Sequence, residues 1–234
     1  MQNPLPLLVG GFFCLTLRPI QYRIECMKNI DLWYSKLEEE ETPETFEASA
    51  ADNESKDRIE TYNNDIYFYS EVKRSNNLSL NKHLAELSNK YLSISHTLGL
   101  ESPVPINLHI NSYGGSVFAG FSSVDYIMQS KVPVVTIIDG CAASAATIMS
   151  VVGSHRKINK NAYMLIHQLS SGMWGKYQEL KDDMKNSEML MKRIVSIYEQ
   201  HTKIPKRKLN EILKHDLWWD AETCLKYGLV DEII

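Results

Sequence analysis

The stretch from Val134 to Met149, VVTIIDGCAASAATIM, constrains the fold more than any other part of the chain. Its first five residues are all β-branched, which indicates a buried strand entered after Pro133. Asp139-Gly140 then breaks the run, and small residues lead into an alanine-rich, helix-like segment. A strand, a tight turn and a helix start, with the Ser144 hydroxyl among small neighbours, can present a nucleophilic serine. A buried packing turn is the simpler explanation of these residues alone, so other parts of the chain must decide.

Strand-like and helix-like patterns alternate along the chain from about Tyr62 onward. Runs of β-branched and aromatic residues predict strands, and apolar residues at steps of three and four predict amphipathic helices. The polar segment from His155 to Asn161 is interpreted as a turn. This alternation predicts an α/β fold with a mostly parallel sheet and right-handed crossovers. The expected strands are 65–72, 104–110, 134–138, 162–167 and 229–234, and the expected helices are 78–98, 118–129, 176–201, 205–213 and 220–227.

The length of 234 residues fits one domain with an extension. We expect residues 1–61 to form an N-terminal extension and acidic linker, partly disordered or processed, and residues 62–234 to form the folded domain. The apolar segment 5–17 follows no basic residue, unlike a signal peptide, which favours a removable propeptide or a true start at Met27. The segment from Glu38 to Asp57 is acidic and poor in large apolar residues, as linkers are.

Charge and cysteine usage exclude several classes of protein. A net charge of −4 gives no reason to expect nucleic acid or an anionic membrane as a partner. No apolar run reaches the length of a membrane span. Four scattered cysteines without CxxC spacing predict free thiols in a reducing, cytoplasmic compartment. We find no metal-binding motif and predict no cofactor.

A serine becomes a nucleophile when a base takes its proton and an acid orients that base. Seven histidines could supply the base. His167 closes the apolar segment AYMLI and precedes a polar segment, and ligands bind at this carboxyl end of strands in open α/β sheets. His109 lies within a predicted strand, where a place on the sheet explains it, and the other five lie in polar helices or turns. His167 is therefore the candidate base.

The segment Asn111-Ser112-Tyr113-Gly114-Gly115 closes another predicted strand. Paired glycines allow positive φ and leave backbone N–H groups accessible, and such groups can bind a developing oxyanion. Glycine pairs are also common in ordinary turns, so this signal is weak by itself.

Three segments together resemble a known family. LHINSYGGSVFAGFSSVDYIMQSKVPVVTIIDGCAASAATIM, then KINKNAYMLIHQ, then HDLWWDAETCLKYGLVDEI are similar to the proteolytic subunit of the Clp protease, ClpP, within residues 65–234. The resemblance implies a ClpP/crotonase-like spiral of βαβ units with a protruding long "handle" helix that begins near Lys176. It also implies a serine endopeptidase that cuts unfolded proteins and peptides as the proteolytic subunit of an ATP-dependent protease.

The resemblance assigns roles to residues by their place in its motifs. Ser144 corresponds to the nucleophile, His167 to the general base and Asp216 to the acid that orients it, with Asp220 and Glu222 as alternatives for the acid. The oxyanion hole corresponds to the backbone amides of Gly115 and Ala145. An extended substrate is expected to add a strand along an exposed edge. The residues expected to bind it are Gly114, Ser116, Val117, Gln168, Leu169 and Ser170.

The resemblance also implies partners: a homo-oligomer of heptameric rings stacked into a tetradecamer, and an AAA+ unfoldase that feeds it unfolded protein. Nucleic acid and membranes are not expected. The chain departs from the family in places, because Tyr113 replaces a usual proline and Ala-Ala follows Ser144 where Met-Gly is frequent. The loop SSGMWGKY replaces a segment richer in glycine, and the region before Asp65 does not match the axial loop that grips the unfoldase.

Two other functions remain open at this point. The first is a catalytically silent ring or scaffold subunit that assembles with active homologues. The second is a crotonase-like acyl-CoA enzyme, which shares the spiral fold and backbone oxyanion donors but has no need of a serine–histidine–aspartate set. A lysine-based signal-peptide-peptidase-like enzyme is disfavoured because Lys157 and Lys160 lie in no such motif.

Overall fold

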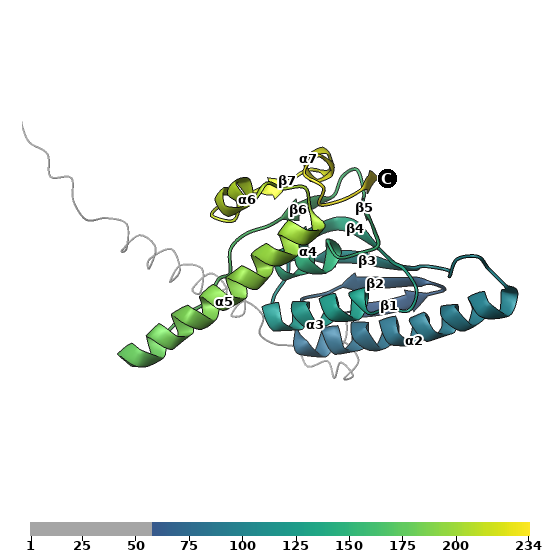
Figure 1. The fold of residues 1–234 in the computed structure, drawn as a ribbon, viewed down its shortest axis with the longest axis horizontal. Coiled ribbons are helices and arrows are strands. Elements are labelled where there is room, and N and C mark those ends of the chain that lie inside the picture. Colours follow the sequence, from purple (N-terminus) through teal and green to yellow (C-terminus); the bar gives the residue numbers. More distant parts are fainter. Residues whose placement is uncertain (1–57) are drawn as a thin grey trace, which may run out of the picture. The chain divides into compact units, whose positions relative to one another are not determined.

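The structure is a computed structural model, and it describes residues 58–234. The predicted propeptide and acidic linker lie outside the described residues. The elements of the domain are shown in Figure 1. In chain order they are β1 (Arg58–Tyr62), β2 (Asp65–Tyr69), α2 (Arg74–Leu98), β3 (Ile106–Ser112), α3 (Val117–Met128), β4 (Val134–Ala143), α4 (Ala145–Ser150), β5 (His155–Ile158), β6 (Tyr163–Leu165), α5 (Tyr177–His201), α6 (Lys206–Ile212), β7 (Trp218–Trp219), α7 (Ala221–Lys226) and β8 (Glu232–Ile233).

The sheet is mostly parallel. The strand order is β1-β2-β3-β4-β5-β8, while β6 pairs with β4 and β7. Only β1 with β2 and β6 with β7 are antiparallel among the described pairs. β4 has two partners on one edge, because its first part pairs with β5 from Val135 to Ile138 and its end pairs with β6 from Cys141 to Ala143. The predicted α/β fold with a mostly parallel sheet is confirmed.

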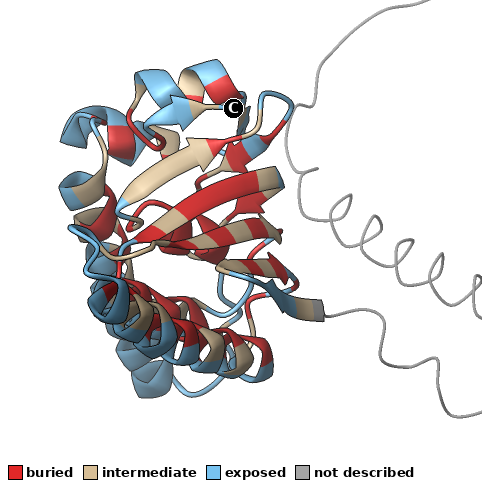
Figure 2. Cartoon of the chain, turned by 90° about the vertical axis from the view of Figure 1, so that its right-hand side faces the viewer, coloured by how far each residue is buried: buried red, intermediate tan, exposed pale blue. Residues whose placement is uncertain are grey.

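Helices cover one face of this sheet. α2 and α3 lie side by side across it, and α4 packs between α3 and β4 (Figure 1). Burial alternates strictly along β3, so alternate residues point into this layer. Buried residues are concentrated where the sheet faces the helices (Figure 2). The core includes Ile66, Phe68, Leu80, Leu84, Ile106, Leu108, Ile110, Val124, Ile127, Ile138, Ile148 and Met149.

The two longest helices predicted from the sequence, 78–98 and 176–201, are present as α2 and α5. α5 spans almost the range expected from the sequence and projects away from the sheet (Figure 1). Its buried residues, Ile194, Ile197 and Tyr198, all lie in its C-terminal half. None of the helices between Arg58 and Ile234 has the length and apolar composition needed to cross a membrane.

Three strands of the structure, β1, β5 and β7, were not predicted from the sequence. The segment 155–161 was interpreted as a turn, and this was wrong for its first part, because His155–Ile158 is the strand β5. Only Ile158 in β5 is buried, and β5 pairs with β8 so that Lys157 lies opposite Glu232, with Lys157 Nζ 3.0 Å from Glu232 Oε2. The antiparallel strand β1 and the two-residue strand β7 were not predicted either.

α2 begins at Arg74 rather than at Leu78. The buried residues of its first turn are Asn76 and Asn77, which apolar periodicity cannot detect. The Asn77 side-chain amide donates to Ser123 Oγ at 2.7 Å and joins α2 to α3.

Arg156 joins β5 to the end of α5 and to the C-terminal segment. Its Nε donates to Asp231 Oδ2 at 2.9 Å, and its Nη2 donates to Asp231 Oδ1. Nη1 donates to the carbonyl oxygens of His201 and Gly228. Only 12% of the Arg156 side chain is exposed. Hydrogen bonds from Arg156 hold the pKa of Asp231 below its usual range.

We predict that Asp231→Ala lowers the free energy of unfolding by about 2 kcal/mol at pH 7, because a largely buried guanidinium loses its carboxylate. The pKa of Asp231 is lower in the folded than in the unfolded state. Its stabilisation is therefore present above about pH 4 and is lost as the pH falls through the folded-state pKa. Urea unfolding between pH 7 and pH 3.5 measures this, and the difference between wild type and variant should shrink at acidic pH. Asp182→Ala, which removes an exposed partner of Lys185, is the matched control. A difference that stays constant with pH would contradict the prediction.

Candidate active site

Ser144 has an unusual backbone conformation. It lies between β4 and α4 with φ 53° and ψ −124°, and Asn63 is the only other non-glycine residue with positive φ among residues 58–234. Such a conformation costs about 1–3 kcal/mol and requires support from its surroundings. The Ser144 N–H donates to the Leu165 carbonyl at 2.9 Å, and its own carbonyl accepts from the N–H of Thr147 at 3.0 Å. A strained serine held from both sides is typical of a nucleophile rather than of an ordinary packing turn.

The glycine turn after β3 lies against this serine. A Cβ on Gly114 would come within 2.6 Å of the Ala143 carbonyl oxygen and 2.7 Å of Ser144 Cβ. Gly114 has φ 95° and Gly115 has φ 140°, conformations that side chains rarely allow. The Gly114 carbonyl accepts from Val72 N, and Ser116 N donates to the Val72 carbonyl. Because backbone groups alternate in direction along an extended segment, the N–H of Gly115 points away from Val72.

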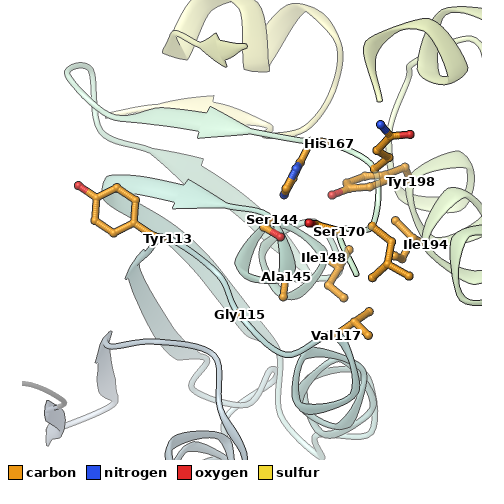
Figure 3. A pocket seen from close by; sticks show the side chains of 12 residues that line it. Tyr113, Gly115, Val117, Ser144, Ala145, Ile148, His167, Ser170, Ile194 and Tyr198 are labelled. Carbon is orange, nitrogen blue, oxygen red and sulfur yellow. The ribbon is translucent and has the colours of Figure 1, made fainter. Parts of the chain in front are cut away.

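Strand pairing brings His167 to Ser144. β6 pairs with the end of β4 so that Leu165 lies opposite Ala143, and His167 follows two residues later. The imidazole of His167 and the hydroxyl of Ser144 point toward each other (Figure 3). Within residues 58–234, no hydrogen bond joins the Ser144 hydroxyl to the His167 imidazole. The next residue is fixed in place, because Gln168 N donates to the Leu213 carbonyl at 2.8 Å.

Asp216 lies beside His167. The Asp216 segment precedes β7, which is antiparallel to β6 with Trp218 opposite Leu165. This register places Asp216 Oδ1 3.1 Å from His167 Nδ1. The Asp216 side chain is 76% exposed and that of His167 is 23% exposed.

The two alternative acids occupy other positions. Asp220 is the N-cap of α7, and its Oδ1 accepts from Thr223 N at 2.8 Å. The hydrogen bonds to Thr223 lower the pKa of Asp220. Glu222 is an exposed residue in the first turn of α7. Of the three candidates, the structure brings Asp216 to the histidine.

A cavity of about 220 Å³ opens beside Ser144. Its floor is apolar, and the side chains of Ser144 and His167 lie at its edge (Figure 3). The floor is formed by Val117, Ile148, Ile194 and Tyr198. The predicted site residues that line the cavity are Gly115, Val117, Ser144, Ala145, His167, Gln168, Leu169 and Ser170.

Two of the predicted substrate-binding residues, Gly114 and Ser116, are not among the residues that line this cavity. Gly114 packs against Ser144, as described above, and Ser116 caps α3 through its Oγ, which accepts from Ala119 N at 3.4 Å. The carbonyl of Gly114 and the N–H of Ser116 are both bonded to Val72. These two groups are therefore occupied, which leaves Gly115 and Val117 on the edge that faces the cavity.

Four residues that line the cavity were not predicted from the sequence: Tyr113, Ile148, Ile194 and Tyr198. Helical periodicity marks Ile194 and Tyr198 as buried, but it does not say which cavity they border. Tyr113 packs edge-on against Trp218 with ring centroids 6.3 Å apart, which joins the glycine turn to the segment of Asp216. No local sequence pattern indicates this contact.

The fold brings three chemical features together. A mostly parallel α/β sheet places a serine on a strained turn, a histidine–aspartate pair and backbone amides close to one another, an arrangement that can support the chemistry of a serine hydrolase.

Comparisons with known proteins specify the family. The family model described as Clp protease matches residues 61–234. The chain is 34% identical over 146 residues to the ATP-dependent Clp protease proteolytic subunit of Deinococcus radiodurans, covering 60% of this chain and 72% of that protein. A solved structure of a ClpP1 mutant from Listeria monocytogenes matches with a TM-score of 0.63 and 25% identity, covering 74% of this chain and 91% of that one. The chain therefore belongs to the Clp protease family, a family of peptidases, and the resemblance is confirmed.

We predict that Gly114→Ala lowers the free energy of unfolding by about 2–3 kcal/mol, because the added Cβ would clash with backbone and would require a positive φ. Gly172→Ala is the matched control, since a Cβ there meets no atom within 4 Å. We expect that control to stay within about 0.5 kcal/mol of wild type in urea unfolding. Equal stability of the two variants would contradict the close approach of Gly114 to Ser144.

Proposed function

We propose that this protein is the serine endopeptidase subunit of an ATP-dependent Clp-type protease, with Ser144, His167 and Asp216 as its catalytic triad. The observation that carries the proposal is the strained Ser144 facing His167, whose Nδ1 lies 3.1 Å from Asp216. Membership of the Clp protease family supports it, as does the name of the Deinococcus radiodurans relative.

The proposed mechanism follows from these positions. Asp216 accepts the Nδ1 proton of His167 and keeps Nε2 free to take the proton of Ser144 Oγ. The serine oxygen then attacks the peptide carbonyl, and the resulting oxyanion accepts hydrogen bonds from the N–H groups of Gly115 and Ala145. His167 gives the proton to the leaving amine, and water hydrolyses the acyl-enzyme with His167 again acting as base.

Substrate recognition through the main chain fits the residues at the cavity edge. An extended peptide would pair with the backbone of Gly115 and Val117 as an added strand. Its side chain next to the cleaved bond would enter the apolar cavity floor. Backbone pairing is independent of sequence, so the substrates we propose are unfolded proteins and peptides of varied sequence, with a preference for apolar residues.

Assembly into stacked heptameric rings, supplied by an AAA+ unfoldase, belongs to the same proposal. The N-terminal half of α5 supports an interface, because it carries several large apolar side chains that are exposed in the described part of the chain. These exposed side chains are Tyr177, Leu180, Met184 and Met189. The cytoplasmic location stays a prediction.

A catalytically silent ring subunit is the second candidate function. The observation in its favour is that Ser144 and His167 form no hydrogen bond within residues 58–234. Hydrogen bonds of this kind are often long or poorly aligned before substrate binds, so the geometry alone does not favour the silent subunit over the enzyme. A crotonase-like enzyme is disfavoured, because it gives no role to the pairing of His167 with Asp216.

We predict that a fluorophosphonate probe labels the assembled protein at Ser144. Ser144→Ala should abolish labelling and lower peptide hydrolysis by about 10⁴-fold or more, because the nucleophile is lost. Ser171→Ala, in the exposed loop near the cavity, is the control and should label normally. The oligomeric mass is measured on each sample. A fully assembled wild type that does not react would favour the silent subunit.

We predict that Asp216→Ala and Asp220→Ala separate the two roles of these aspartates. Loss of Asp216 leaves His167 without its orienting group and should lower kcat by about 10³–10⁴-fold. Loss of Asp220 removes a helix cap and should leave kcat within about threefold of wild type, with some loss of thermal stability. Steady-state hydrolysis of a short peptide measures both. Equal losses of kcat would exclude Asp216 as the specific partner of His167.

A further inference from the structure

A chain of buried hydroxyl groups connects α5 to the carbonyl of Ser144. Thr147 lies in α4, and its Oγ1 is 2.6 Å from the carbonyl oxygen of Ser144. The same Oγ1 lies 2.5 Å from the phenol oxygen of Tyr198 in α5. Thr147 is 0% exposed and Tyr198 is 1% exposed, so water does not compete for these bonds.

The donor and acceptor in each of these hydrogen bonds follow from the Ser144 carbonyl oxygen at their end. A carbonyl oxygen can only accept, so Thr147 must donate its single hydroxyl proton to Ser144. In the hydrogen bond between Thr147 and Tyr198, the Tyr198 phenol must then be the donor and Thr147 Oγ1 the acceptor. Burial raises the pKa of Tyr198, which keeps the phenol protonated and able to donate. The hydrogen bonds therefore run from Tyr198 to Thr147 and from Thr147 to the Ser144 carbonyl.

These bonds act on the peptide unit between Ser144 and Ala145. That unit is planar and trans, so the Ser144 carbonyl and the Ala145 N–H point in opposite directions. Bonds that fix the carbonyl therefore also fix the N–H. Ala145 is the first residue of α4, so its N–H has no partner within the helix, and Ala145 lines the cavity. The strained conformation of Ser144 gives this peptide a reason to rotate when its support is removed.

We propose that Thr147 and Tyr198 are positioning residues that hold the Ala145 N–H in the direction of the developing oxyanion. This inference rests on the proposed function, because it concerns the oxyanion hole of the same reaction. Both hydroxyls act through the peptide between Ser144 and Ala145, and neither takes or gives a proton in the reaction.

The test compares four single variants with wild type. Thr147→Val and Tyr198→Phe each remove one hydroxyl and keep nearly the same shape, while Thr147→Ser retains the hydroxyl. Ser150→Ala is the matched control: it removes another buried hydroxyl of α4, one that donates to the Thr147 carbonyl and not to Ser144. Peptide hydrolysis gives kcat and KM, and melting temperature and oligomeric mass are measured for every sample.

We expect Thr147→Val and Tyr198→Phe to lower kcat by about 10- to 30-fold, somewhat less than the loss of a whole oxyanion donor. KM should stay within about twofold, because the oxyanion forms only in the transition state. Thr147→Ser should recover kcat to within about threefold of wild type, and Ser150→Ala should leave it within about twofold. The double variant Thr147→Val/Tyr198→Phe should lose no more than Thr147→Val alone, since both hydroxyls act along one path.

Three results would overturn the inference while leaving the proposed function intact. They are a wild-type kcat in both hydroxyl-deficient variants, an equal loss of kcat in Ser150→Ala, or a rise in KM without a fall in kcat. If Thr147→Val does not assemble, Tyr198→Phe decides the matter, because it keeps the ring that fills the cavity floor. An assembled wild type that neither hydrolyses peptide nor reacts with the fluorophosphonate would instead overturn the proposed function.

Discussion

The conformation of Ser144 is the constraint on which the rest of the site depends. A non-glycine residue with φ 53° is unstable by itself, and three separate segments hold it here. The carbonyl of Leu165 accepts its N–H, Thr147 donates to its carbonyl twice, and Gly114 packs against its side chain. Each of these contacts requires a small or specific neighbour, which explains why alanine and glycine surround the hydroxyl.

The division of β4 between two partners decides which segments can reach this serine. Up to Ile138 β4 pairs with β5, and from Cys141 it pairs with β6, so the segment that carries His167 is led to the end of β4. Asp139 lies between these two parts and accepts hydrogen bonds from Tyr69 in β2 and from the Asn159 amide after β5, while His109 Nδ1 lies 2.7 Å away. Burial, and then the bond to Asp139, raises the pKa of Tyr69 to about 12. A single carboxylate therefore ties neighbouring segments together where the sheet divides.

Much of the fold could be predicted from local patterns, because β-branched runs and helical periodicity report burial along a single element. Two of the segments that escaped prediction carry polar residues, while β7 escaped because it is only two residues long. β5 pairs charged side chains with β8, and the first turn of α2 buries Asn76 and Asn77 instead of apolar residues. Apolar patterns cannot find such positions, where the side-chain amide of Asn76 donates to Ser70 before α2 and that of Asn77 donates to Ser123 in α3.

The sequence by itself determined the α/β class, the long helix and, through three motifs in order, the residues Ser144, His167 and Asp216 as candidates. Only the tertiary structure placed Asp216 rather than Asp220 beside the histidine, because that choice depends on the register of β7 on β6. The cavity floor and the bond between Thr147 and Tyr198 were likewise decided by the packing of α5 against α4. Local sequence determines which face of an element is buried, whereas contacts between residues 51 positions apart depend on how whole elements pack.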